Sequence, residues 1–143
     1  MQTTIYVSYP SSDLERSKAF YTAVGATFEP RLSDENGACL AWGDNIFFML
    51  MDRDFLASFT EKEIIDPRTS AQVQSAFTCA SREEVDRIAE AGLAAGGTEH
   101  GPPQDHGFLY TRDLEDPDGN VIAFMYGTPD AAEAGPETEL AQV

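Results

Sequence analysis

The chain has 143 residues, of which 42% are apolar and 24% are charged, the balance of an ordinary folded domain rather than of a disordered chain. Acidic residues outnumber basic ones by 25 to 9, which gives a formal net charge of −16. This excess argues against a nucleic-acid partner or an anionic membrane surface, because both need basic patches. The sequence has no apolar run of membrane-helix length and no basic-apolar leader, so we expect a cytoplasmic protein.

The two cysteines, Cys39 and Cys79, lie far apart in the sequence and form no C-x-x-C pair. This spacing gives neither a zinc-ribbon motif nor a thioredoxin motif, and a disulfide is not expected in the cytoplasm. We therefore predict two buried, inert thiols.

The first half of the chain predicts a strand, a helix and three further strands. Ser12 and Glu15 form the pattern of a capping box, so we expect a helix that begins after Ser12 and ends at Gly25. Residues 43–45 join the last two strands and carry a hairpin signal. The predicted strands are 2–9, 28–32, 38–42 and 46–51.

A segment without a strand pattern follows over residues 53–70. Phe55, Leu56 and Phe59 favour one short amphipathic turn, and Pro67 closes the segment. A connection of this length is uncommon inside a domain, so we expect it to cover a surface or to be flexible.

The second half repeats the order of the first. Ser81 and Glu84 form a second capping box, and residues 96–97 end the second predicted helix as Gly25 ends the first. The last two strands flank a type I turn over residues 116–119. The predicted strands are 72–79, 98–100, 107–114 and 121–126, and residues 120–123 match residues 45–48.

Self-similarity of this kind indicates duplicated supersecondary units. We predict an α+β fold in which two βαβββ modules form a cupped, curved mixed sheet with the helices outside. A single domain is expected over residues 1–127, with module one at 2–52, a linker at 53–70 and module two at 71–127. Residues 128–143 carry acidic residues but no basic one, and predict a flexible acidic tail.

Three features together suggest a family: the duplicated units, the first helix with Leu14, Phe20-Tyr21 and Gly25, and the late turn from Glu115 to Asn120. In this order they resemble the glyoxalase, bleomycin-resistance and extradiol-dioxygenase group, the vicinal oxygen chelate superfamily. The resemblance covers roughly residues 2–127 and implies a fold rather than one reaction. Its members include lactoylglutathione lyases, ring-cleaving dioxygenases, epimerases, thiol transferases and drug-binding proteins.

In the enzymes that the chain resembles, a divalent metal lies in the cup, held by the first and last strands of each unit. The resemblance places these ligand positions at Tyr6 or Ser8, at Phe48, at Val73 or Gln74, and at Ala123. Only Gln74 is an ordinary metal ligand among them, Tyr6 is a rarer one, and a single amide does not hold a cation well. We therefore predict no metal and no other cofactor.

Aromatic and apolar residues on the strands of the predicted cup favour a planar or apolar ligand. We predict a binding protein for a small molecule, a drug or a metabolite, whose usual metal-ligand positions are lost, and the acidic charge would steer cationic ligands toward it. Core packing is the alternative for the aromatic residues, although the resemblance places Phe48 at the cleft. The predicted ligand-binding residues are Tyr6, Ser8, Trp42, Phe48, Gln74, Tyr110, Ala123 and Met125.

Whether the chain is an enzyme stays open at this point. One alternative is a lactoylglutathione-lyase-like or extradiol-dioxygenase-like enzyme that holds Fe, Zn, Ni or Mn on relocated ligands, with Gln74, Tyr6 or His106 among them. Another is a metal-free isomerase, with His106 as a general base and Arg112 as the group that holds a carboxylate or phosphate. The simpler interpretations are an exposed loop histidine and an arginine paired with an acid.

A homodimer is expected, because the edge strands of such units need cover. The sequence leaves open whether the cup forms within one chain or between two.

Overall fold

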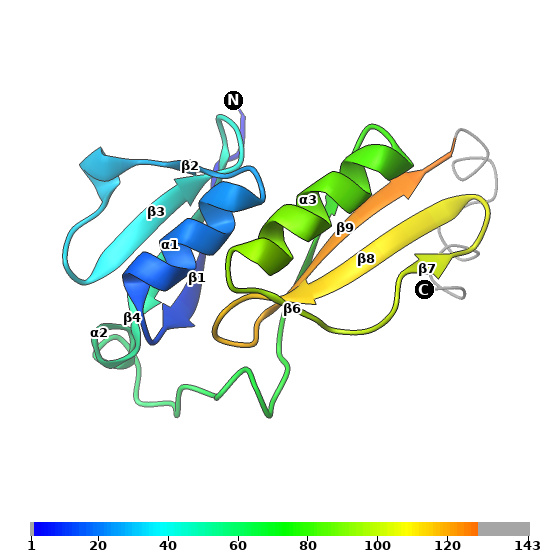
Figure 1. Cartoon of the computed structure of the whole chain (residues 1–143). Helices are drawn as coiled ribbons and strands as arrows, with labels where there is room; N and C mark the ends of the chain where they lie inside the picture. Colours follow the sequence, from blue (N-terminus) through cyan, green and yellow to red (C-terminus); the bar gives the residue numbers. More distant parts are fainter. Residues whose placement is uncertain (1, 129–143) are drawn as a thin grey trace.

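Two mixed β-sheets, each with a long helix packed against one side, make up the fold (Figure 1). The computed structural model describes residues 2–128. The first sheet has the order β1-β4-β3-β2 and consists of β1 (Ile5–Ser11), β2 (Thr27–Phe28), β3 (Gly37–Ala41) and β4 (Ile46–Asp52). The second has the order β5-β9-β8-β6, with β7 paired to β8, and consists of β5 (Gln74–Thr78), β6 (Thr98–Glu99), β7 (Gln104–Asp105), β8 (Leu109–Glu115) and β9 (Val121–Gly127).

The helices are α1 (Leu14–Ala23), α2 (Arg53–Ala57) and α3 (Arg82–Ala94), with a 3-10 turn at Pro30–Leu32. The α+β fold class predicted from the sequence is confirmed. None of the described helices is long and apolar enough to cross a membrane. The acidic tail predicted at 128–143 lies outside the described residues, apart from Thr128.

Of the two helix N-caps predicted from the sequence, Ser81 and Ser12, the structure has only the first. The side chain of Ser81 accepts a hydrogen bond from the backbone N–H of Glu84 at 3.1 Å, so Ser81 is the N-cap of α3 as predicted. In α1 the N-cap is Asp13, which accepts from the N–H of Arg16 at 3.1 Å, and the predicted cap at Ser12 is wrong. The physical reason is a competing tertiary partner, because both the N–H and the hydroxyl of Ser12 donate to Asp118.

Two other predicted boundaries change for local reasons. The strand predicted at 28–32 ends at Phe28, because Pro30 has no N–H for a ladder and opens the 3-10 turn instead. The first strand runs through Pro10 to Ser11, which is possible because β1 is an edge strand of its sheet.

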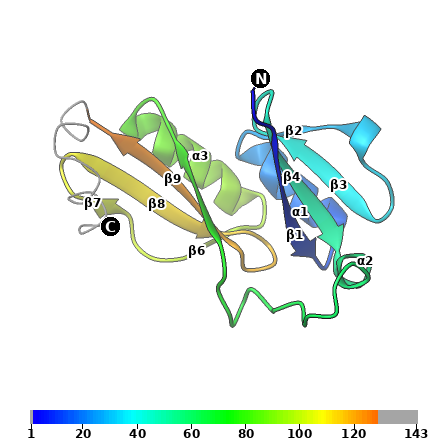
Figure 2. The same ribbon diagram turned by 180° about the vertical axis from the view of Figure 1, so that it is seen from behind.

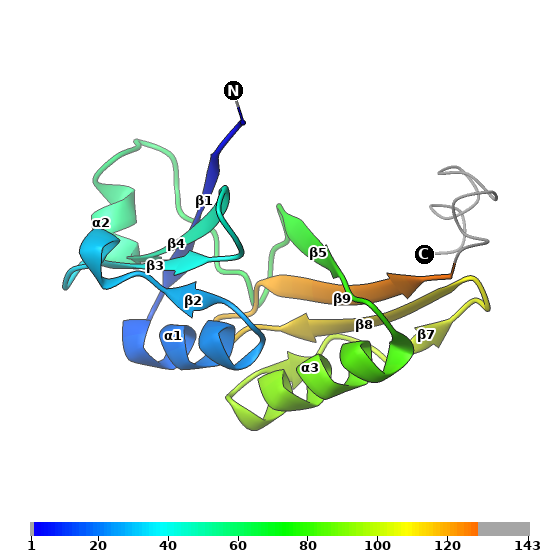
Figure 3. The ribbon, with the colours of Figure 1, turned by 90° about the horizontal axis from the view of Figure 1, so that it is seen from above.

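Both sheets turn their helix-bearing sides toward one shared core. α1 and α3 lie side by side (Figures 1 and 3), and a Cβ added at Gly92 of α3 would lie only 2.8 Å from Val24 and 3.1 Å from Phe20. Phe77 of the second sheet reaches across to the first, with ring centroids 4.2 Å from Trp42 and 5.8 Å from Phe48. The two βαβββ units are therefore packed into one body through aromatic contacts and a close helix approach.

We call the sides of the two sheets that face away from α1 and α3 the open face. Figure 2 shows this side, with β1 and β5 in front of the two long helices. Both strands are edge strands of their sheets, and the hydroxyls of Tyr9 and Ser75 join them at 2.6 Å. A ligand cup of the kind predicted from the sequence would lie on the open face.

Candidate functional site

The open face of the first sheet carries an aromatic pair. Tyr6 of β1 lies in register with Phe47 of β4, and their rings stack with centroids 4.9 Å apart and an interplanar angle of 14°. Tyr6 is 54% exposed, and Ser8 lies on the same side, two residues further along β1. The sheet therefore presents a flat aromatic surface to solvent.

The open face of the second sheet is lined by small and polar side chains. Ala123 of β9 lies beside Ala76, and Met125 lies beside Thr78, opposite in direction to the Phe77–Phe124 pair on the core side. Gln74 occupies the start of β5 on this side and is exposed. The structure thus places Tyr6, Ser8, Gln74, Ala123 and Met125 of the predicted set on the open face.

Phe48 and Trp42 lie elsewhere, and the expectation that they line the cup is wrong. Phe48 is 2% exposed and packs in the core, with ring centroids 5.0 Å from Tyr9 and 5.5 Å from Trp42. It pairs with Val7, one step along from the Tyr6–Phe47 pair, and a shift of one residue moves a side chain to the other face. Phe47 and Met49, the two neighbours of Phe48, therefore hold the open-face positions of β4.

Tyr110 and Arg112 also point away from the open face, toward α3. The hydroxyl of Tyr110 donates to Asp86 at 2.6 Å, and Arg112 donates to Asp86, Glu90 and Glu99 at 3.3, 3.0 and 2.6 Å. Burial opposes the charge of Arg112, but these carboxylates together raise the pKa of its guanidinium. Arg112 is 7% exposed and fully engaged, which matches the simpler interpretation of an arginine paired with acids.

The two histidines are separate from the open-face residues named above. His106 precedes β8, and its Nε2 lies 3.4 Å from the Oε1 of Gln104. His100 lies 3.0 Å from Glu115 in an exposed pair. Within residues 2–128 no hydrogen bond or ion pair joins His106 to Arg112, so these two candidates do not form a linked catalytic pair.

The donor set of the open face does not fit the divalent metal that the family resemblance implies. The predicted ligand positions on this face carry a phenol, a hydroxyl, an amide and a methyl group, at Tyr6, Ser8, Gln74 and Ala123. The open side of β4 adds only Phe47 and Met49. In the part of the chain that the structure describes, no three His, Cys, Asp or Glu side chains lie close enough together to hold a metal ion. A hard or borderline cation needs several such donors.

The two cysteines are free thiols. Cys39 is fully buried and Cys79 is half-buried, and burial is the main cause that raises the pKa of both thiols. The prediction of a buried thiol is confirmed for Cys39 and wrong for Cys79. The raised pKa disfavours the reactive thiolate form of both.

A cavity that the sequence did not reveal lies beside the open face, between the linker and the bodies of both sheets. Its volume is about 420 Å³. Its walls come from β1, from the segment between α2 and β5, and from the start of β9. The linker forms one wall, which is the covering role expected from its length.

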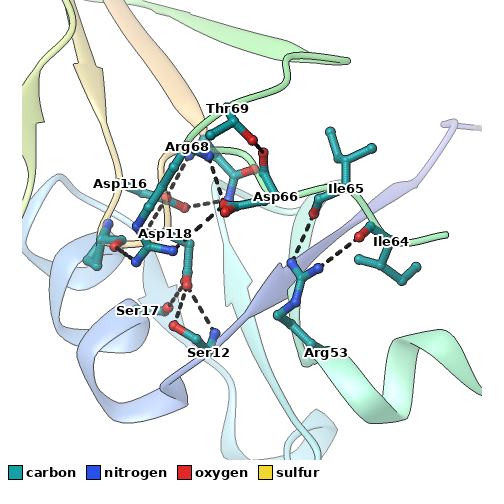
Figure 4. A network of polar contacts seen from close by, with 12 residues as sticks. Ser12, Ser17, Arg53, Ile64, Ile65, Asp66, Arg68, Thr69, Asp116 and Asp118 are labelled. Atoms are coloured by element: carbon teal, nitrogen blue, oxygen red, sulfur yellow. Dashed lines mark hydrogen bonds and ion pairs between the residues drawn. The ribbon is translucent and has the colours of Figure 1, made fainter.

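Two arginines hold the linker in this position (Figure 4). The guanidinium of Arg53 donates to the carbonyls of Ile64 and Ile65 at 2.8 and 3.0 Å, and Arg68 donates to the carbonyl of Pro117 at 3.1 Å. The middle of the linker is therefore fixed to its own first residue, Arg53, and its end is fixed to the turn before β9.

The turn from Asp116 to Asn120 connects the two modules through side-chain hydrogen bonds. Asp118 accepts hydrogen bonds from the N–H and hydroxyl of Ser12 and from the hydroxyl of Ser17 (Figure 4), and Asp116 accepts one from Tyr21 at 2.7 Å. Burial raises the pKa of the Asp116 carboxyl, and hydrogen bonds from Tyr21 and Asn120 offset this in part. The motif that carried the family resemblance thus connects module two to α1.

Comparison with known proteins gives one family. The family model described as the Glyoxalase/Bleomycin resistance protein/Dioxygenase superfamily matches residues 4–124. No curated protein matches the chain in sequence.

Solved structures share the fold. A hypothetical protein from S. aureus is similar over 88% of this chain and 94% of its own, with a TM-score of 0.75 and 20% identity. A glyoxalase/bleomycin resistance protein from Albidiferax ferrireducens has a TM-score of 0.64 and 25% identity, over 85% of this chain and 95% of its own. A lactoylglutathione lyase from Agrobacterium tumefaciens has a TM-score of 0.65 and 18% identity, over 89% and 95%.

Proposed function

Because the chain belongs to the glyoxalase/bleomycin resistance protein/dioxygenase superfamily, we propose that it is a binding protein that holds a drug or metabolite on its open face. The observation that supports this proposal is the stack of Tyr6 on Phe47, in which Tyr6 is 54% exposed and holds a position where the resemblance expects a metal ligand. Aromatic planes bind flat apolar molecules by stacking and by burial of area.

The charge of the chain favours a cationic ligand. A net charge of −16 produces a negative potential that raises the local concentration of cations near the surface. A planar aromatic cation would combine this attraction with stacking on Tyr6.

We further propose that a second copy of the chain completes the cup. The open face of one chain exposes Tyr6, and β1 and β5 both end their sheets without a neighbour on the outer side in the described structure. Strand edges and aromatic surfaces of this kind gain from cover by a partner. The proposed location is the cytoplasm, in keeping with the two free thiols.

The first experiment measures metal content and ligand binding on the same full-length protein. We expect well under one tenth of an equivalent of Fe, Zn, Ni or Mn per chain after incubation with each metal, since one amide does not retain a cation. We also expect saturable binding of proflavine, a planar aromatic cation, which Tyr6→Ala weakens about tenfold through loss of stacking.

Ile46→Ala is the matched control, because Ile46 is an exposed apolar residue of β4 on the opposite side of the strand from Phe47. It should leave proflavine affinity unchanged. Near one metal per chain together with metal-dependent turnover would instead support the lyase or dioxygenase alternative and would contradict the proposed function.

A further inference from the structure

We propose that the cavity under the linker is a second ligand site, which takes a neutral, apolar small molecule with one hydrogen-bond donor, and that Asn120 accepts this bond. The cavity has a volume of about 420 Å³, within the range of about 300–1,000 Å³ that is typical of ligand pockets.

The walls of the cavity are mostly apolar, and some of them are left exposed. Ile65 is 39% exposed and Val73 is 50% exposed, and both border the cavity. Val7, Leu56, Ile64 and Val121 extend the apolar lining. A molecule bound here would remove the exposed apolar surface of Ile65 and Val73 from water, and this burial would favour binding.

The linker is held so that the cavity stays open. Arg53 fixes the carbonyls of Ile64 and Ile65, and the backbone of Pro67 and Arg68 rests against Gly119. A Cβ added at Gly119 would lie 2.8 Å from the nitrogen of Arg68, so the linker and the turn are already in closest contact there. The cavity is therefore a product of the fold, bounded by fixed backbone on the linker side.

Asn120 supplies a free acceptor at the wall. Its Nδ2 donates to Asp116 at 2.9 Å, and because that partner is a carboxylate, the other end of the amide must be the oxygen. No described residue donates to this Oδ1, and it is not among the buried polar atoms without a partner, so it retains contact with solvent. Asn120 borders the cavity and is 9% exposed, and we assign its free oxygen to the cavity wall.

The charges at the cavity favour a neutral molecule. Lys62 and Glu63 border it side by side and carry opposite signs. An anion would meet the net charge of −16, and a cation would have to leave water for mostly apolar walls.

This site is independent of the proposed function. Ser8 is the one residue of the predicted open-face set that also lines the cavity, and Tyr6, Gln74, Ala123 and Met125 do not line it. Binding in the cavity can therefore succeed or fail irrespective of whether proflavine binds the open face.

The test compares indole with 1-methylindole on the full-length, ¹⁵N-labelled protein by NMR titration. The two probes have similar apolar bodies, but only indole has an N–H donor. We expect saturable shifts at Ile64, Ile65 and Val73, with 1-methylindole binding about fivefold more weakly, the effect of one neutral hydrogen bond.

Val73→Trp should fill the cavity and weaken indole binding at least tenfold. Leu32→Trp is the matched control, because Leu32 has nearly the same exposure, 49%, but does not line the cavity, and it should leave indole affinity unchanged. Both variants must keep the dispersed spectrum of the folded wild-type chain.

Three results would overturn the proposal. They are the absence of saturable indole binding, shifts confined to the open face, and equal loss of affinity in the two tryptophan variants. Equal affinity for the two probes would overturn the role of Asn120.

Discussion

At the scale of single residues, Asp118 connects the two halves of the chain. It is 3% exposed and accepts three hydrogen bonds, two from Ser12 and one from the hydroxyl of Ser17. A buried carboxylate is tolerated only when such donors replace its water. The residue that the sequence presents as part of a turn is thus a tertiary contact between module two and the start of α1.

Replacement of Asp118 by alanine should therefore destabilise the whole domain. We expect Asp118→Ala to lower the free energy of unfolding by about 3 kcal/mol, because it removes three hydrogen bonds, one of them from the buried hydroxyl of Ser17. Urea unfolding at pH 7 measures this quantity. Asp44→Ala, in the exposed β3–β4 hairpin, is the control and should change it by less than about 0.5 kcal/mol. Equal stability of Asp118→Ala and Asp44→Ala would contradict the role of Asp118 in connecting module two to α1.

At the scale of elements, the linker is seated on the turn before β9. Gly119 has a φ of +104°, and its missing side chain leaves room for the backbone of Pro67 and Arg68 at 2.8–3.0 Å from where a Cβ would be. Gly43, in the β3–β4 hairpin, has a similar φ of +131° but no neighbour within 4 Å of its Cβ position. A comparison of alanine variants at Gly43 and Gly119 therefore distinguishes the cost of backbone strain from the cost of a clash with the linker.

We expect Gly43→Ala to cost about 1 kcal/mol, the strain of a left-handed alanine. Gly119→Ala should cost about 2 kcal/mol more, because it also drives the linker away from the turn. Thermal unfolding of both variants measures the difference. If both lose the same stability, the linker does not rest on Gly119 as described.

At the scale of the whole molecule, the helix sides of the two sheets share one core while the open sides face outward. The aromatic contacts of Phe77 with Trp42 and Phe48 join the sheets on the helix side. On the other side, Tyr6 is left 54% exposed. One chain therefore presents both halves of a cup surface without enclosing them, and a second copy would supply the cover.

If a second copy covers the open face, a charge placed on Tyr6 should separate the copies. We expect the wild-type chain to sediment at about twice its mass of 15.6 kDa, and Tyr6→Asp to sediment as a monomer. Ile46→Asp adds the same charge on the opposite side of the first sheet and should leave the dimer intact. Sedimentation velocity distinguishes these states, and a dimeric Tyr6→Asp variant would contradict the proposed interface.

The predictions from sequence succeeded where short-range rules decide. The N-cap at Ser81, the turn at 116–119 and the βαβββ order of the first unit all rest on neighbouring residues, and the structure has each of them. In the second unit the short strand β7 was not predicted. The cap at Ser12 failed because its true partner, Asp118, is distant in sequence. No local signal encodes a partner that only folding brings near.

The sequence alone determined the order of the longer helices and strands, the α+β class and the family, because patterning, caps and turns act within a few residues. The tertiary structure decided which side of each strand is open. Phe47 and Phe48 are adjacent residues of the same type, so the sequence does not distinguish them. Only the pairing of Phe47 with Tyr6 and of Phe48 with Val7 places the first on the open face and the second in the core. It also decided the path of the linker and the cavity beneath it, because Arg53, Arg68 and Gly119 meet their partners only when the two sheets share one core.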